Sequence, residues 1–111
     1  MGWSATPKMV LIYTKPSGKK PFSLWLNRLK DERSRRRILT RLRNLEEGNF
    51  GDSKHLKGGI RELRLFFGPG YRVYFGVDNM QIVVLLCAGE KGSQQKDIEK
   101  ALIYWKEYVK P

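Results

Sequence analysis

Apolar residues recur along the chain with the spacings of both strands and helices. An apolar run over residues 9–13 predicts a short strand, which the turn formers of residues 15–21 end. Pro21 suits the first turn of a following helix. The apolar residues of that helix have the i, i+3, i+4, i+7 spacing, and they are Phe22, Trp25, Leu26 and Leu29. The chain is therefore expected to begin with a strand and an amphipathic helix.

A second helix is predicted between Asp31, a candidate N-cap, and Gly48, a residue type that often follows a helix end. Its apolar stripe is narrow and consists of Ile38, Leu42 and Leu45. Arginines occupy much of the remaining surface, and they are Arg33, Arg35, Arg36, Arg37, Arg41 and Arg43. This basic surface either binds RNA or is an ordinary solvent-exposed helix face.

The second half of the chain alternates between turn formers and β-rich runs. A polar loop at residues 48–59 precedes predicted strands at residues 60–67, 71–77 and 81–88. Ser93 is a candidate N-cap for a last helix. The apolar stripe of that helix is Ile98, Ala101, Leu102, Trp105 and Val109. The order β-α-α-β-β-β-α predicts one α+β domain, residues 1–111, in which helices cover one face of a small, mainly antiparallel sheet.

The middle hairpin predicts which side chains share a face of the sheet. A three-residue loop at residues 68–70 would place Arg64 directly across from Tyr74. The apolar pairs of the hairpin would then face the helices. The opposite, open face would carry four polar side chains, which are Glu62, Arg64, Arg72 and Tyr74.

These polar side chains suit a phosphate-binding site. Arginine makes bidentate contacts with phosphate oxygens, and tyrosine can stack on a base or donate a proton. Lys54 and Lys57 in the neighbouring loop would add positive charge. The alternative is a solvated sheet face on which Glu62 pairs with one of the arginines.

The net charge of +11 favours a polyanionic partner. The chain has 22 Lys and Arg against 11 Asp and Glu. The excess is largest in residues 1–50, with 12 basic and 4 acidic side chains, against 10 and 7 in residues 51–111. Nucleic acid, a ribosome or an acidic protein would match this charge. A basic protein that is merely soluble is the alternative.

The rare residue types exclude several classes of site. Cys87 is the only cysteine and His55 the only histidine, so an intrachain disulfide and a Cys/His metal site are excluded. No phosphate-binding glycine motif or metal-binding carboxylate cluster is present, so neither metal nor cofactor is expected. A chain without disulfides suits a reducing cytoplasm. The longest apolar run, residues 82–88, is too short to span a bilayer, and the N-terminus has no signal-peptide pattern.

Several short motifs follow one another along the second half of the chain. They are Glu62-Leu-Arg64, Gly68-Pro-Gly-Tyr-Arg-Val-Tyr74, Leu85-Leu-Cys-Ala-Gly-Glu-Lys91 and Gln94…Asp97-Ile98…Ala101…Trp105. With the early Phe22…Trp25-Leu26 helix, this series resembles the RelE/ParE superfamily of type II toxin–antitoxin toxins. Within the superfamily it is most similar to the HigB-like addiction module killer subgroup. The resemblance covers nearly the whole chain.

The resemblance implies helices packed on a small antiparallel sheet and a metal-independent endoribonuclease that cuts mRNA on the ribosome. In that reaction a ribose 2′-hydroxyl attacks the adjacent phosphate, which requires a base, fixed cations and a proton donor. The resemblance also implies a cognate antitoxin, typically a small helix-turn-helix protein. Two alternatives stay open: the ParE branch poisons DNA gyrase instead, and a non-toxic basic module would only bind nucleic acid.

The resemblance also implies roles for individual residues. Arg72 would contact the scissile phosphate, and Arg64 would share that role as its neighbour in the predicted hairpin. Lys91 matches a basic position after the last strand, and Tyr74 would stack on a base or assist proton transfer. Lys54 and Lys57 match loop lysines of the family, and one of them, with Lys54 placed in the catalytic set, is a candidate base activated by neighbouring like charges. Expected RNA or ribosome contacts are Lys57, His55 (alternatively an acid or base), Arg61, Arg36, Arg37 and Arg41.

Overall fold

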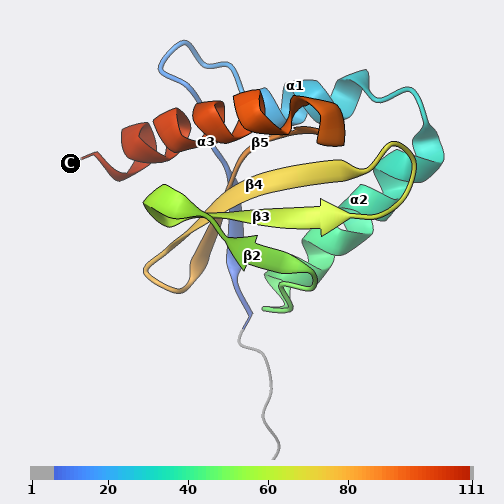
Figure 1. The fold of residues 1–111 in the computed structure, drawn as a ribbon. Helices are drawn as coiled ribbons and strands as arrows, with labels where there is room; N and C mark the ends of the chain where they lie inside the picture. Colours follow the sequence, from blue (N-terminus) through green and yellow to red (C-terminus); the bar gives the residue numbers. More distant parts are fainter. Residues whose placement is uncertain (1–6, 111) are drawn as a thin grey trace, which may run out of the picture.

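A mixed five-stranded sheet forms the centre of the molecule (Figure 1). The computed structural model describes residues 7–110. The strands lie in the order β1-β5-β4-β3-β2, and only β1 runs parallel to its neighbour. Their bounds are β1 (Met9–Ile12), β2 (Ser53–His55), β3 (Ile60–Leu65), β4 (Tyr71–Asp78) and β5 (Ile82–Glu90). The predicted α+β class and mainly antiparallel sheet are confirmed.

The described residues contain three α-helices: α1 (Pro21–Arg28), α2 (Glu32–Glu46) and α3 (Gln94–Val109). Asp31 caps α2 as predicted, since its carboxylate accepts a hydrogen bond from the Arg33 backbone N–H at 3.0 Å. Gly48 follows the helix with φ of +83°. Ser93 occupies the N-cap position of α3 as predicted, but its hydroxyl accepts no hydrogen bond from the helix backbone and instead donates to the Asp97 carboxylate.

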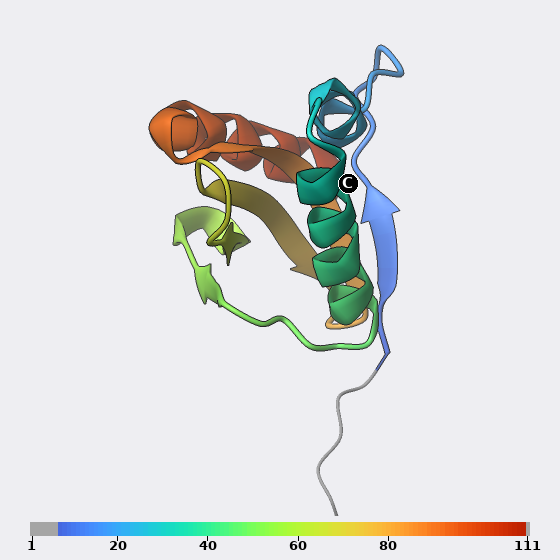
Figure 2. The same ribbon diagram turned by 90° about the vertical axis from the view of Figure 1, so that its right-hand side faces the viewer.

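The helices cover both faces of the sheet, so the expectation that they share one face is wrong. α1 and α2 pack on one face through Phe22, Ile38 and Leu45. α3 packs on the other through Ala101 and its apolar neighbours. In Figure 2, α1 and α2 lie together beside β1, and α3 lies apart from them. The sheet accepts two layers because β3, β4 and β5 carry buried side chains on both faces.

Two glycines let α3 lie close to its face of the sheet. A Cβ atom at Gly76 of β4 would lie 2.3 Å from the Trp105 ring of α3. A Cβ atom at Gly89 of β5 would lie 1.9 Å from the Asp97 carboxylate. A side chain at Gly76 would collide with the rigid indole ring, and one at Gly89 would require the Asp97 carboxylate to move. The sheet is therefore shaped for α3 at both ends of the contact.

The β3–β4 hairpin has a longer turn than predicted. Leu65 pairs with Tyr71, which leaves residues 66–70 in the turn. Arg64 therefore lies across from Arg72, and not from Tyr74. The register moves by two residues, and a shift of two keeps every side chain on its predicted face. The prediction that Glu62, Arg64, Arg72 and Tyr74 share one face is correct.

Part of the predicted polar loop is a strand. Residues 53–55 form β2 and pair antiparallel with β3, so that Lys54 lies opposite Glu62 and His55 opposite Arg61. The sequence of this strand has no apolar alternation, because β2 is an exposed edge. No helix within residues 7–110 has the length and apolar character to cross a membrane. The expectation about a signal peptide concerns the N-terminus and lies outside the described residues.

Candidate functional site

Arg64 and Arg72 face each other across β3 and β4, at the end of the sheet where α3 begins. Like charges in directly opposite positions repel. The Asp52 carboxylate reduces this repulsion in part, because it accepts a hydrogen bond from Arg64 Nη2 at 2.9 Å. Arg72 is only 8% exposed, and within residues 7–110 its side chain has neither hydrogen bond nor ion pair. A nearly buried charge without a partner is costly, so this position suits an anion.

Lys91 lies at the same end of the sheet. It follows β5 directly, and its backbone N–H donates to the Gly70 carbonyl at 2.8 Å. This bond ties the segment after β5 to the turn that precedes Arg72. The Lys91 side chain is exposed there. The structure thus brings together the arginine pair and the lysine that the sequence placed in one site.

Beneath α3 lies a buried carboxylate, Glu62, which the sequence placed on the same face as the arginines but without a role in the site. Glu62 is fully buried, and its Oε2 accepts from the Tyr74 hydroxyl at 3.1 Å and from the Gln94 amide at 2.7 Å. Its Oε1 has no hydrogen bond and lies 4.0 Å from the Lys54 ammonium. Lys54 is therefore beside a carboxylate, which differs from the expected surroundings of like charges. A glutamate inside a buried strand was the available signal.

The predicted role of Tyr74 in stacking on a base is wrong. Its ring is fully buried, because α3 covers the face that was expected to be open. Burial raises the pKa of the Tyr74 hydroxyl far above its usual value, and the Glu62 carboxylate raises that pKa further. Tyr74 is therefore a neutral hydrogen-bond donor, and with Gln94 it fixes the position of Glu62.

Two of the expected RNA or ribosome contacts lie on the other face of the sheet from Arg64 and Arg72. His55 and Arg61 are cross-strand neighbours on the side of α1 and α2, with 2.6 Å between His55 Nε2 and Arg61 Nη1. The Arg61 guanidinium lies over the Phe50 ring. Lys57 is exposed in a short 3-10 turn before β3, at the far end of that strand from Arg64. These three residues do not join the site around Arg72.

The arginines of α2 form a separate basic region. Arg36 is exposed and lies 3.7 Å from Glu32. Arg37 lies over the Phe67 ring, 4.2 Å from its centroid. Arg41 has a buried Nη2 atom without a hydrogen-bond partner. The predicted site residues therefore lie in three separate places. One group surrounds Arg72 near the start of α3, a second lies on the side of α1 and α2, and Lys57 lies in the turn before β3.

A comparison with known protein families covers the part of the chain that carries this site. The family model described as "Phage derived protein Gp49-like (DUF891)" matches residues 24–106, which include Lys54, Arg64, Arg72 and Lys91. The chain belongs to the Gp49-like family. This is a toxin–antitoxin-associated family. An uncharacterized protein from Haemophilus influenzae is 48% identical over 80 residues, which is 72% of this chain and 81% of that protein.

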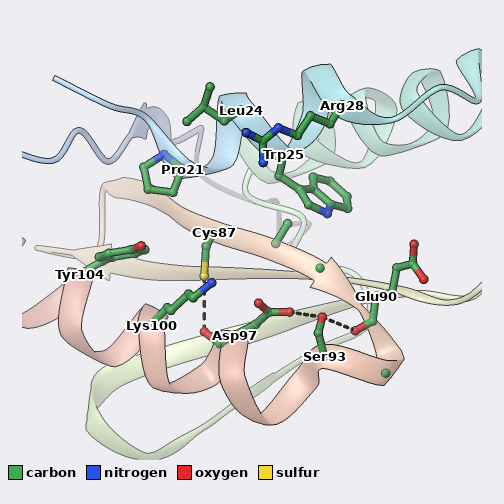
Figure 3. A pocket seen from close by; sticks show the side chains of 13 residues that line it. Pro21, Leu24, Trp25, Arg28, Cys87, Glu90, Ser93, Asp97, Lys100 and Tyr104 are labelled. Atoms are coloured by element: carbon green, nitrogen blue, oxygen red, sulfur yellow. Dashed lines mark hydrogen bonds between the residues drawn. The ribbon is translucent and has the colours of Figure 1, made fainter. Parts of the chain in front are cut away.

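A cavity of this Gp49-like protein lies elsewhere, between α1 and α3 over the end of β5 (Figure 3). Its volume is about 620 Å³, and its charged lining is mixed in sign, with Arg28 and Lys100 against Glu90 and Asp97. None of the expected catalytic residues lines it. Cys87 is buried beside it, and burial raises the pKa of its thiol to about 12, which agrees with the predicted core role.

No group of three or more His, Cys, Asp or Glu side chains suited to a metal ion occurs in the described part of this Gp49-like chain. Arg64 and Lys91 lie at the same end of the sheet as Arg72, together with the carboxylates of Asp52 and Glu90. Within this group Arg72 has no anionic partner, and a guanidinium suits direct binding of an anion.

Tyr74→Phe is expected to make the stability of this Gp49-like protein less sensitive to alkaline pH. Below about pH 10, Tyr74 keeps its proton in the folded and unfolded states alike. At higher pH the unfolded chain loses that proton first, because the folded-state pKa is raised, so the free energy of unfolding falls. The Tyr74 contribution to this slope is at most about 1.4 kcal/mol per pH unit. Urea unfolding of both proteins across this pH range measures it, and equal slopes would contradict the raised pKa.

Proposed function

We propose that this Gp49-like protein is the toxin of a type II toxin–antitoxin module and an endoribonuclease of the RelE/HigB kind, acting on mRNA at the ribosome. The observation that carries the proposal is Arg72, a nearly buried arginine without an anionic partner, opposite a second arginine. Family membership supports the toxin class. The net charge of +11 supports a polyanionic substrate.

In the proposed reaction, the 2′-oxygen of a ribose forms a bond to the adjacent phosphorus and the bond to the 5′-oxygen breaks. The product has a 2′,3′-cyclic phosphate on one side and a 5′-hydroxyl on the other. One proton leaves the 2′-hydroxyl, and one is gained by the 5′-oxygen. Negative charge grows on the phosphoryl oxygens, so fixed cations accelerate the step without a metal ion.

The residues of the site divide these tasks. Arg72 and Arg64 bind the non-bridging oxygens, and Lys91 adds a third cation at the rim. Lys54 is the proposed proton-transfer group: its amine takes the proton that leaves the 2′-hydroxyl, and the resulting ammonium gives a proton to the 5′-oxygen. Its side chain is 52% exposed and so open to substrate, and its nitrogen lies 4.0 Å from Glu62. Glu62 is a positioning residue for Lys54. Asp52 orients Arg64 through the 2.9 Å ion pair.

We further propose an antitoxin as the partner, because membership of this family suggests one. The positive charge of the toxin favours an antitoxin with an acidic binding surface. A small helix-turn-helix protein is the form that the RelE/HigB resemblance implies.

The experiment that tests the function maps 5′ ends on a reporter mRNA by primer extension after the chain is induced in growing cells. We expect new 5′ ends inside the translated region, and their loss when translation initiation is blocked. Growth arrest with intact mRNA and gyrase-dependent DNA damage would contradict the proposal and favour a gyrase poison. Expression without growth arrest, together with salt-sensitive nucleic-acid binding, would also contradict the proposal and favour a non-toxic module that only binds nucleic acid.

A further inference from the structure

A small cleft between α2 and the β3–β4 turn combines aromatic rings with cations. Its volume is about 370 Å³, and it is lined by Arg37, Thr40, Arg41, Phe66 and Phe67. Phe66 is 72% exposed and is the most exposed aromatic side chain among residues 7–110. An exposed ring beside a basic helix offers a free face on which a ligand with its own flat face can stack.

The cations of this cleft are placed for a ligand that is both aromatic and anionic. The Arg37 guanidinium covers the Phe67 ring at 4.2 Å, and the Arg64 guanidinium lies 5.5 Å from the Phe66 centroid. Arg41 has a buried Nη2 without a hydrogen-bond partner. No carboxylate lines the cleft. A nucleobase with its phosphate supplies the flat face, the acceptor atoms and the negative charge.

Arg64 joins the cleft to the phosphate site. Its side chain contacts Phe66, and its position in β3 is directly opposite Arg72. One RNA strand could therefore place a phosphate at Arg72 and the next base against Phe66. Base-paired nucleotides are stacked on their neighbours and cannot offer a free face, so the arrangement requires an unpaired base.

We infer that this cleft, with Phe66 as its stacking platform, binds an unpaired nucleobase next to the phosphate held by Arg64 and Arg72. The identity of the ligand as RNA rests on the proposed function. Stacking is tolerant of base identity, so the cleft selects single-stranded over double-stranded RNA more strongly than it selects sequence.

The test uses a short single-stranded 2′-O-methyl RNA, which lacks the attacking hydroxyl and is not cleaved by the proposed reaction. Fluorescence anisotropy measures its affinity for the full chain at fixed salt. Phe66→Leu keeps an apolar side chain but removes the ring, and we expect roughly tenfold weaker binding. Phe66→Trp is expected to restore or exceed the original affinity. The same RNA annealed to its complement is expected to bind both proteins equally.

Ile103→Ala is the matched control, because Ile103 is 63% exposed on α3 and belongs to no proposed site. Thermal unfolding of each variant checks that the fold is intact. An unchanged affinity in Phe66→Leu, an equal loss in Ile103→Ala, or an equal loss for the duplex would each overturn the inference. So would a Phe66-dependent loss confined to antitoxin binding, which would assign the cleft to a protein partner.

Cleavage is measured separately, on unmodified mRNA with ribosomes. Cleavage by the wild-type chain together with Phe66-independent RNA binding would overturn the cleft and leave the proposed function standing. Phe66-dependent binding without any cleavage would overturn the proposed function and leave the cleft as a binding site for single-stranded RNA. The two proposals therefore fail in distinguishable ways.

Discussion

Arg72→Met is expected to abolish mRNA cleavage and to raise the free energy of unfolding. Met keeps much of the length of the arginine side chain and removes its charge. Without the guanidinium, the charge that grows on the phosphoryl oxygens loses its nearly buried counter-ion. Loss of one such stabilising group lowers the rate by about 100-fold or more. The cleavage rate on ribosome-bound mRNA measures this effect.

The gain in stability follows from the same burial. Arg72 is 8% exposed and contacts no carboxylate among the described residues, so folding removes its charge from water without a compensating ion pair. An apolar replacement at such a position is expected to stabilise the protein by about 1–2 kcal/mol. Urea unfolding measures this, provided that the dependence on urea concentration is unchanged.

Two further variants make the prediction specific. Arg28→Met removes an exposed arginine of α1 outside the proposed site and is expected to leave the cleavage rate and the stability nearly unchanged. Arg72→Lys keeps the charge but loses the bidentate geometry, so we expect intermediate activity. Retained cleavage in Arg72→Met would refute the phosphate role. Lost cleavage with lower stability would mean that Arg72 is a structural residue.

Gly76→Ala is expected to lower the free energy of unfolding by about 1–3 kcal/mol. The new methyl group would lie 2.3 Å from one Trp105 ring atom and within 2.6 Å of two more, so the indole must move. Trp105 stacks on Tyr108, and both pack α3 against the sheet, so the whole contact is displaced. The melting temperature is expected to fall by roughly 4 °C per kcal/mol.

Gly92→Ala is the matched control for this substitution. Nothing lies within 4 Å of the position of its added methyl group, and its backbone φ is not in the left-handed region. Its stability is expected to stay within about 0.5 kcal/mol of the wild type. Equal thermal shifts in the two variants would show that the close approach of α3 to Gly76 does not control stability.

The elements of this fold could be predicted from the sequence because each has a local signal. The apolar spacing from Phe22, the Asp31 cap and the glycine at residue 48 all correspond to observed helix limits. The alternation in the central hairpin placed Arg64 and Arg72 on the correct face. Local patterns of this kind depend on near neighbours in the chain, and these are visible in the sequence.

The arrangement of the elements was less accessible, because it depends on contacts between distant segments. The stripe of α3 shows that the helix packs, but it does not show on which face of the sheet. The turn at residues 66–70 could not be distinguished from a three-residue loop by side-chain alternation, since both give the same faces. Because the face covered by α3 is not visible in the sequence, Tyr74 is predicted on a solvent-exposed face, whereas in the structure α3 buries it. The burial of Glu62 depends on the same contact with α3, although its position within a β-rich run is a local sign of it.

The site joins strands that differ greatly in how firmly they are held. Arg72 lies on β4, which has a strand on each side and a helix layer on each face. Lys54 lies on β2, a three-residue edge strand, and Asp52 directly precedes it. Edge segments with few buried contacts open locally long before the whole protein unfolds. The proposed phosphate anchor thus lies in a firmly packed strand, while Asp52 and the proposed proton-transfer group Lys54 lie on an edge that can open and close again without loss of the fold.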